Sequence, residues 1–177
     1  MKPRGNGILL HISSLPSPYG IGDIGPAACR FVDFLSSTGQ KYWQILPLTV
    51  TDPVHDDNPY HSISAFANNP LFISPELMAA DGLIDPSDLA NPPDFPGSRV
   101  DFPAVIPYKE ALFSQAYDRF SRGGDMPAYE RFCKENAGWL DDFALFSAIR
   151  SDRPDQTWNQ WPDGLKNRNP TVIEAER

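Results

Sequence analysis

The sequence predicts an α/β protein, because two short apolar runs flank a segment with helical spacing. The runs Gly7 to Ile12 and Tyr42 to Leu46 are too short for helices and suit strands. Between them, Pro26 to Gly39 begins with a proline suited to a first helical turn and ends with a glycine suited to a helix stop. Strand, helix and strand with short connections form a βαβ unit, which builds a parallel sheet with a right-handed crossover.

Each element of this unit follows from its own residues. The first run is bounded by Gly7 and by two serines, and we expect a strand that is buried on both faces, as in a parallel sheet. The second run is closed by Pro47. The helix has apolar side chains at helical spacing: Ala27, Ala28, Phe31, Val32, Phe34 and Leu35. The loop GIGDIG before the helix lacks the spacing of a nucleotide-binding loop, and its glycines let the chain turn sharply.

A long segment, Pro47 to Pro70, follows the second strand, on the carboxyl-end side where α/β enzymes gather binding residues. Its stretch Asp56 to Pro70, DDNPYHSISAFANNP, combines amide and hydroxyl side chains with aromatic rings. Sugars need this mixture, because hydroxyls form directional hydrogen bonds and the pyranose face packs on aromatic surface. A loop whose Asn and Ser side chains satisfy its own turns fits the composition equally well.

Helical patterns replace strand patterns from Pro75 onward. The stretch SPELMAADGLI predicts a helix that stops at Gly82, and the proline-rich stretch after it shows no strand pattern. Apolar spacing predicts three more helices, Tyr108 to Phe120, Ala128 to Asn136 and Trp139 to Ile149. Asn169 can cap a last helix with Pro170 in its first turn, and we expect this helix to be cut short at Arg177. We therefore divide the chain into residues 1–74, the βαβ unit with a substrate-binding loop, and residues 75–177, a helical insertion subdomain truncated at its C-terminus.

The composition indicates a globular protein whose partner is not a nucleic acid. The chain has 177 residues, of which 41% are hydrophobic, and its formal net charge is −8 without a dense Lys/Arg stripe. A neutral polyol such as a sugar fits this charge better. The apolar run at the start is too short for a signal peptide, and no stretch approaches the roughly 18 apolar residues of a membrane span, so we expect a cytoplasmic protein with no membrane partner. Cys29 and Cys133 are predicted to be buried free thiols.

Four separated motifs resemble one family in the same order: RGNGILLHISSLPSPYGIGDIG, WQILPL with NPYHSISAFANNPLFISPELM, WLDDFALFSAI, and WNQWPDGL. They are similar to amylomaltase, the 4-alpha-glucanotransferase or disproportionating enzyme of glycoside hydrolase family seventy-seven, over nearly the whole chain. The resemblance implies the N-terminal part of a (β/α)8 TIM barrel with helical insertions. It also implies the transfer of alpha-1,4-glucan segments among maltose, maltodextrins and amylose by a retaining double displacement, without a metal or an organic cofactor.

The catalytic carboxylates of that mechanism have no matching position in this chain. The resemblance implies that all three lie on later barrel strands, and a closed barrel takes about 250 residues, whereas this sequence supplies two candidate strands. Asp141 and Asp142 are expected on the solvent side of a helix, and the side chains of Asp56 and Asp57 are expected to diverge in a loop. We therefore predict no catalytic residue here and expect this stretch alone to be inactive.

The resemblance assigns two substrate-binding residues to the loop. Tyr60 matches the family tyrosine that lines the glucose subsite at the cleavage point, and Asn58 lies where a polar residue of the family approaches the donor sugar. The alternative for Tyr60 is a loop tyrosine that packs under a lid. Ser62 and Ser64 are expected to be cap or turn residues rather than sugar contacts.

Other conspicuous residues are expected to be structural. His55 and His61 have no third ligand nearby, so we predict no metal site. The four tryptophans are expected to pack in the core or the subdomain rather than to serve as sugar platforms: Trp43, Trp139, Trp158 and Trp161. Two other functions stay open, a non-catalytic glucan-binding or interaction module and a hydrolase of the alpha-amylase group.

Overall fold

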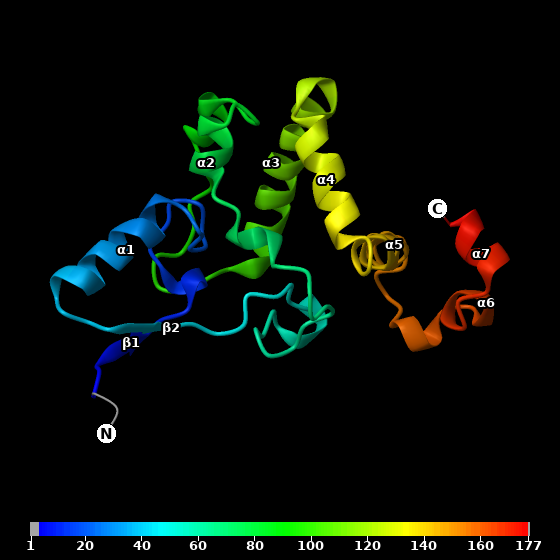
Figure 1. Cartoon of the computed structure of the whole chain (residues 1–177), viewed down its shortest axis with the longest axis horizontal. Coiled ribbons are helices and arrows are strands. Elements are labelled where there is room, and N and C mark those ends of the chain that lie inside the picture. The colour runs from blue at the N-terminus through cyan, green and yellow to red at the C-terminus, as the bar shows by residue number, and fades with distance from the viewer. Residues whose placement is uncertain (1–3, 177) are drawn as a thin grey trace. The chain divides into compact units, whose positions relative to one another are not determined.

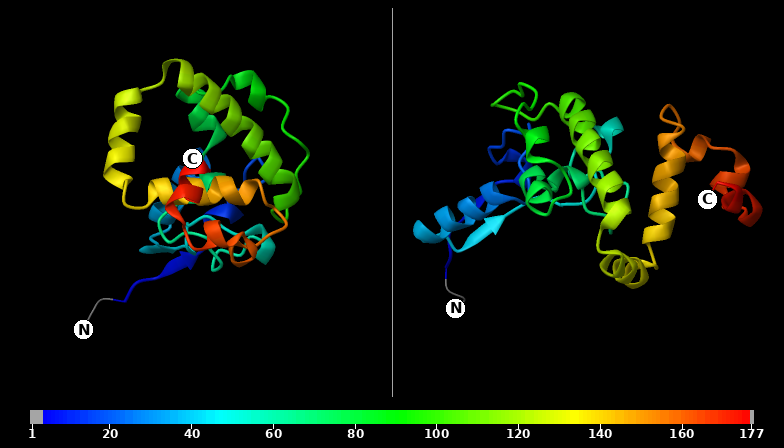
Figure 2. Two further views of the ribbon diagram at one scale, coloured as in Figure 1. Left: turned by 90° about the vertical axis from the view of Figure 1, so that its right-hand side faces the viewer. Right: turned by 90° about the horizontal axis from the view of Figure 1, so that it is seen from above.

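The computed structural model describes residues 4–176, and the chain divides into two compact units, one ending at Asp125 and one beginning at Met126 (Figures 1 and 2). The elements of the first unit are β1 (Gly7–Leu9), η1 (Ile12–Ser14), α1 (Pro26–Ser37), β2 (Tyr42–Gln44), η2 (Pro53–His55), η3 (Pro70–Phe72), α2 (Pro75–Ala80), η4 (Pro86–Leu89) and α3 (Phe102–Gly123), where η denotes a 3-10 turn. Those of the second unit are α4 (Met126–Asn136), α5 (Leu140–Ser151), η5 (Trp158–Gln160), α6 (Asp163–Lys166) and α7 (Pro170–Ala175).

The predicted βαβ unit is confirmed. β1 and β2 pair in parallel, with Gly7 opposite Tyr42 and Leu9 opposite Gln44, and α1 forms the connection between them (Figure 1). Phe31 of α1 meets Trp43 of β2 edge-on, with ring centroids 5.0 Å apart. The helix therefore covers one face of the two-stranded sheet.

The predicted burial of the first strand on both faces is wrong for this structure. Each strand is only three residues long, and Leu9 and Tyr42 are exposed. Parallel strands become buried when neighbouring strands and helices cover them. Among residues 4–176 the sheet has two strands, so most of that cover is absent from the described chain.

Residues 75–125 pack into the first unit, which ends at Asp125. α2 and α3 lie side by side (Figures 1 and 2), with Met78 of α2 and Leu112 of α3 in one apolar cluster. Val105 of α3 is completely buried in a second cluster, which also contains Ile12 and Phe72. These contacts join α3 to segments that come long before it in the chain.

A buried lysine ties α3 to the loops of the first unit. Lys109 has no exposed side-chain surface; its Nζ donates a hydrogen bond to the carbonyl of Ile73 at 2.8 Å and lies 3.9 Å from Oδ2 of Asp23. Desolvation lowers the pKa of Lys109 to about 8, and the carboxylate of Asp23 opposes this shift. Burial raises the pKa of Asp23 in turn, against the attraction of Lys109.

Local signals set several helix ends as predicted. Asn169 accepts a hydrogen bond from the backbone N–H of Thr171 at the start of α7, as the sequence predicts. α2 ends at Ala80, and Gly82 follows with a φ of 73°. α3 instead begins at Phe102, well before the predicted Tyr108. Pro103 fits in its first turn, and the helix continues through Pro107.

In the second unit, α6 ends in a Schellman motif that has an arginine at the position where glycine is usual. Arg168 has a φ of 53°. Its backbone N–H donates to the carbonyl of Leu165 at 3.0 Å, and the N–H of Asn169 donates to the carbonyl of Gly164 at 2.8 Å. A residue with a Cβ in this left-handed conformation costs roughly 1–2 kcal/mol relative to glycine. The core beside this turn consists of Ile149, Trp161 and Leu165.

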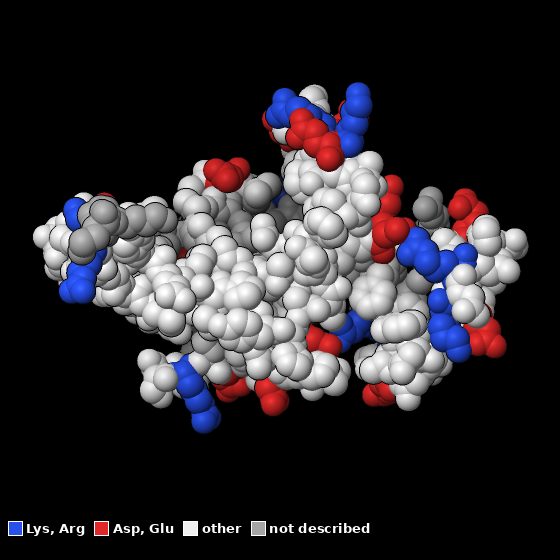
Figure 3. Space-filling view, turned by 60° about the horizontal axis from the view of Figure 1, so that its bottom comes forward, with Lys and Arg blue, Asp and Glu red and all other residues white. Residues whose placement is uncertain are grey.

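Both cysteines are free, but the prediction that they are buried is wrong. Cys29 is exposed on α1 and Cys133 is partly exposed on α4. No helix within residues 4–176 is long and apolar enough to cross a membrane. On the face drawn in Figure 3, basic and acidic side chains are interspersed, and the blue side chains form no continuous stripe.

Candidate functional site

The segment after β2 folds back on itself and forms a loop at the carboxyl ends of the two strands. The N–H of Asn69 donates to the carbonyl of Leu48 at 2.8 Å, and the N–H of Val50 donates to the carbonyl of Ala67 at 3.0 Å. Antiparallel bridges join Thr49 to Asn68 and Thr51 to Ser62. Only a few residues separate the end of β2 from this loop, so the sheet positions it.

A cavity of about 260 Å³ lies where this loop meets the ends of the strands. His11, just beyond β1, and Leu46, just beyond β2, both line it, together with Asp57, Asn58 and Asn69 from the loop. The predicted site residue Asn58 therefore lies at the carboxyl ends of both strands. This is the side of a parallel sheet where α/β proteins bind ligands.

His11 forms one wall of the cavity and is held in one orientation. Its Nδ1 accepts a hydrogen bond from the backbone N–H of Leu46 at 3.3 Å, and its ring packs edge-on against Phe72 at 5.3 Å. Burial lowers the pKa of His11, which favours the neutral imidazole. Because Nδ1 is the acceptor, the neutral ring carries its proton on Nε2.

A chain of buried hydrogen bonds holds the loop beneath Asn58. The hydroxyl of Thr51 donates a hydrogen bond to Oδ1 of Asp57 at 2.8 Å. The same hydroxyl accepts a hydrogen bond from Nδ2 of Asn69 at 3.2 Å. Oδ1 of Asn69 in turn accepts from the N–H of Leu71 at 3.0 Å. Asp57 and Asn69 are both buried. Burial raises the pKa of Asp57, and the hydrogen bond from Thr51 opposes that shift.

The backbone next to Asn58 adopts an uncommon conformation that the sequence did not reveal. Asp56 and Asp57 both have positive φ angles, 55° and 51°, in the left-handed region. Such residues cost of the order of 1–3 kcal/mol each and persist where surrounding contacts fix them. Here the side chain of Asp57 is fixed by Thr51. Adjacent aspartates in a loop are a weak signal for this turn, since aspartate tolerates the left-handed region better than most residues.

Tyr60 lies in the turn that Asn58 forms. Oδ1 of Asn58 accepts a hydrogen bond from the N–H of Tyr60 at 2.9 Å, and the N–H of His61 donates to the carbonyl of Asn58 at 2.9 Å. The amide oxygen of Asn58 is therefore occupied, while its NH2 group is the part suited to a ligand. Tyr60 is 70% exposed and does not line the cavity, so the structure brings Asn58 but not the Tyr60 ring to the ends of the strands.

The predicted turn roles of the two serines agree with the structure. The hydroxyl of Ser62 lies 2.7 Å from the carbonyl of Val50, and that of Ser64 accepts from the N–H of Ala67 at 3.0 Å. The rings of His55 and His61 are tilted by 41° to each other, with centroids 4.6 Å apart. Within residues 4–176 no group of three His, Cys, Asp or Glu side chains could hold a metal ion.

The acidic residues lie as expected. Asp141 and Asp142 are exposed on α5, and Asp56 is exposed whereas Asp57 is buried, so the side chains of this second pair diverge. In the loop GIGDIG, the carboxylate of Asp23 is buried and faces Lys109. That carboxylate would oppose a phosphate group in this loop.

Three of the four tryptophans are at least partly buried, as predicted, and one is not. Trp43 packs on Phe31, Trp139 lies near Phe143, and Trp161 is buried. Trp158 is 58% exposed, so the prediction that it packs in the interior is wrong.

These features agree with the comparisons between this chain and known proteins. The family model of glycoside hydrolase family 77, described as 4-alpha-glucanotransferase, matches residues 10–177, and the chain belongs to this family. It is 42% identical to the 4-alpha-glucanotransferase of Streptococcus pneumoniae, over all of this chain and 35% of that protein. The corresponding protein of Synechocystis is 39% identical over 98% of this chain and 35% of its own length.

A solved structure shows the same fold. The amylomaltase from Streptococcus agalactiae, in complex with acarbose, superposes with a TM-score of 0.91 at 34% identity, over 99% of this chain and 35% of that one. The chain thus spans about a third of the length of the relatives that it matches.

Proposed function

We propose that this chain supplies the opening part of a (β/α)8 barrel and part of the donor-sugar site of a 4-alpha-glucanotransferase. The full reaction would transfer alpha-1,4-glucan segments between maltodextrins, with maltose and amylose as further substrates, by a retaining double displacement. The observation that carries this proposal is the cavity at the carboxyl ends of β1 and β2, lined by Asn58, in a chain of the 4-alpha-glucanotransferase family.

In this proposal the chain binds and orients the sugar, and the catalytic carboxylates come from outside it. A retaining mechanism needs two carboxyl groups about 5–5.5 Å apart on opposite sides of the bond. Asp57, the buried carboxylate of the cavity, is engaged by Thr51, and its neighbour Asp56 is exposed. The NH2 group of Asn58 would donate to a sugar hydroxyl, and the exposed ring of Tyr60 would cover the apolar face of a glucose unit.

A cytoplasmic location stays a prediction from the sequence. One relative, from Solanum tuberosum, is named as chloroplastic or amyloplastic.

The proposal can be tested with a fusion in which this chain replaces the equivalent 35% of the Streptococcus agalactiae amylomaltase. Given maltotriose, the fusion is expected to produce glucose and longer dextrins. Tyr60→Ala is expected to lower turnover on the order of tenfold or more, equivalent to about 1.4 kcal/mol of lost transition-state binding. A matched control is Tyr117→Ala, because Tyr117 on α3 is also 70% exposed.

Two outcomes would contradict the proposal. A time course that yields only shorter sugars would identify a hydrolase instead of a transferase. Equal kinetics for Tyr60→Ala and Tyr117→Ala would remove Tyr60 from the site.

A further inference from the structure

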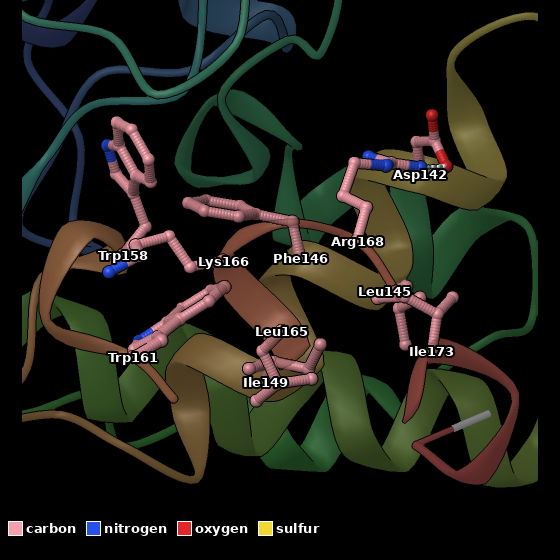
Figure 4. A pocket seen from close by; sticks show the side chains of 10 residues that line it. All are labelled: Asp142, Leu145, Phe146, Ile149, Trp158, Trp161, Leu165, Lys166, Arg168 and Ile173. Atoms are coloured by element: carbon pink, nitrogen blue, oxygen red, sulfur yellow. Dashed lines mark hydrogen bonds and ion pairs between the residues drawn. The ribbon is translucent and has the colours of Figure 1, made fainter. Parts of the chain in front are cut away.

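The second unit has a pocket of its own, of about 250 Å³, which the proposed reaction does not use. Figure 4 shows the side chains that line it, which come from α5, η5, α6 and the segment from Arg168 to α7. Aliphatic side chains form its inner part: Leu145, Ile149, Leu165 and Ile173. All of these residues belong to the second unit, so this pocket is separate from the Asn58 cavity.

Three aromatic rings border the pocket. Trp161 is 7% exposed and packs against Phe146, with ring centroids 5.4 Å apart at 42°. Trp158 is 58% exposed, which leaves much of its indole surface free to meet a ligand. An exposed indole near a buried and a partly buried ring is the kind of surface on which the apolar face of a sugar ring packs.

The charges at the rim neutralise one another. Nη2 of Arg168 lies 2.6 Å from Oδ1 of Asp142, and Nζ of Lys166 lies 2.8 Å from Oδ1 of Asp163. An anionic ligand would have to displace these carboxylates from their cations. A neutral ligand with hydroxyl groups meets both donors and acceptors here, since a guanidinium donates and a carboxylate accepts.

The stability of the fold does not explain why an arginine occupies position 168. Arg168 stands at the left-handed position of a Schellman motif, where glycine would relieve the backbone strain. Its ion pair with Asp142 is more than half exposed on both sides, and exposed pairs contribute little to stability. Residues kept in strained conformations are often found at functional sites. The strain here places a guanidinium at the rim of an aromatic pocket (Figure 4).

One buried donor among the lining residues is unpaired. Within residues 4–176, the indole Nε1 of Trp161 is buried and has no hydrogen-bond partner, whereas buried donors are normally paired.

We propose that this pocket is a second carbohydrate-binding site, which takes one or two glucose units of an alpha-1,4-glucan. One glucose ring stacks on Trp158, and the hydroxyls of the other unit exchange hydrogen bonds with Arg168 and Asp142 at the other end of the pocket (Figure 4). The choice of alpha-glucan as the ligand rests on the proposed function; the preference for a neutral polyol rests on the pocket itself. The site would hold a glucan chain on the same molecule as the Asn58 cavity and so raise its local concentration.

The test is a titration of the whole chain with maltotetraose, followed through the four indole N–H signals in two-dimensional NMR. The signals of Trp158 and Trp161 are expected to shift, with a dissociation constant on the order of 1 mM, as a small open pocket allows. Trp158→Ala is expected to weaken this binding on the order of tenfold. Phe132→Ala, which removes another exposed ring of the second unit, is the control and should leave the binding unchanged.

Arg168→Gly separates a binding role from a structural one. Glycine fits the left-handed turn, so the melting temperature is expected to stay the same or rise while glucan binding weakens on the order of tenfold. A lower melting temperature with unchanged binding would show that Arg168 is structural and would overturn its assignment to the site. If the four indole signals are not dispersed in the isolated chain, the same variants are titrated in the fusion with the Streptococcus agalactiae protein.

Several results would overturn the proposal as a whole. One is the absence of any shift at Trp158 and Trp161 with maltotetraose; another is an equal shift with sulfate or with a beta-linked tetrasaccharide. A third concerns the fluorescence emission of Trp158 in the fusion. If that emission is typical of a buried indole and does not change when glucan is added, other parts of the protein cover the pocket. Tyr60→Ala distinguishes the two proposals. If this variant loses transfer activity and the Trp158 signal of the wild type does not shift with glucan, the proposed function stands and only the second site is ruled out.

Discussion

The loop after β2 and the pocket of the second unit use polar side chains in opposite ways. In the loop, Thr51, Asp57 and Asn69 are buried or partly buried and hydrogen-bonded to one another, so they hold the backbone that carries Asn58. In the pocket, the polar groups of Arg168 and Asp142 lie exposed at the rim, and the interior is aromatic and aliphatic. The loop therefore depends on its internal hydrogen bonds for its shape, whereas the pocket obtains its shape from apolar packing and has its polar groups exposed at the rim.

The largest expected effect is loss of the buried lysine of the first unit. Lys109→Ala would leave the carboxylate of Asp23 buried without its cation, at a cost of about 3–5 kcal/mol. The unfolding of the first unit can be followed in urea through the indole signal of Trp43, its one tryptophan, while Trp139, Trp158 and Trp161 report on the second. Only the Trp43 transition should move to lower urea. A parallel shift of all four signals would show that the units unfold together.

The next effect concerns the hydrogen bonds of the loop. Thr51→Val removes the hydroxyl between Asp57 and Asn69 and is expected to cost about 1–3 kcal/mol, because it leaves a buried carboxylate short of a donor. In the fusion with the Streptococcus agalactiae protein we expect kcat/KM for maltotriose to fall on the order of tenfold. Thr51→Ser keeps the hydroxyl and serves as the control. Similar activity of the Val and Ser variants would show that the chain of hydrogen bonds does not position Asn58.

A smaller effect is expected from the helix cap of the second unit. Asn169→Ala removes the acceptor for the N–H of Thr171 and should destabilise the second unit by about 1 kcal/mol. Thermal melts followed at Trp161 should show it, and the Trp43 signal should not change. Ser74→Ala is the equivalent change in the first unit, since Ser74 caps α2. If each variant shifts both melts, the two units are not independent in stability.

The smallest effect is a dependence of stability on pH. Burial lowers the pKa of His11 in the folded chain, so the unfolded chain binds a proton at His11 first as the pH falls through its ordinary value of 6.5. The stability that neutral His11 contributes is present above pH 6.5 and is lost as the pH falls toward the lowered pKa. The free energy of unfolding of the first unit should decline more steeply between pH 7 and pH 5 in the wild type than in His11→Gln.

Features that depend on neighbouring residues could be predicted before the structure was known. The apolar runs and Pro26 predicted the parallel βαβ unit, Gly82 predicted the end of α2, and Asn169 with Pro170 predicted the start of α7. The motif around Asn58 and Tyr60 predicted a binding loop after a strand, and the structure places Asn58 in a cavity there. These signals are local because caps, turns and helical spacing act over a few residues.

Features that depend on contacts between distant segments became visible only in the folded chain, because the tertiary structure sets them. It buried Lys109 against Asp23 and Ile73, and it carried α3 into the first unit although prolines flank and enter the helix. It left Trp158 exposed where its neighbour Trp161 is buried, and it placed Asp57 in a left-handed turn against Thr51. The physical reason is that burial and hydrogen bonding of a side chain depend on which remote surfaces meet it, and residue type and spacing do not specify that meeting.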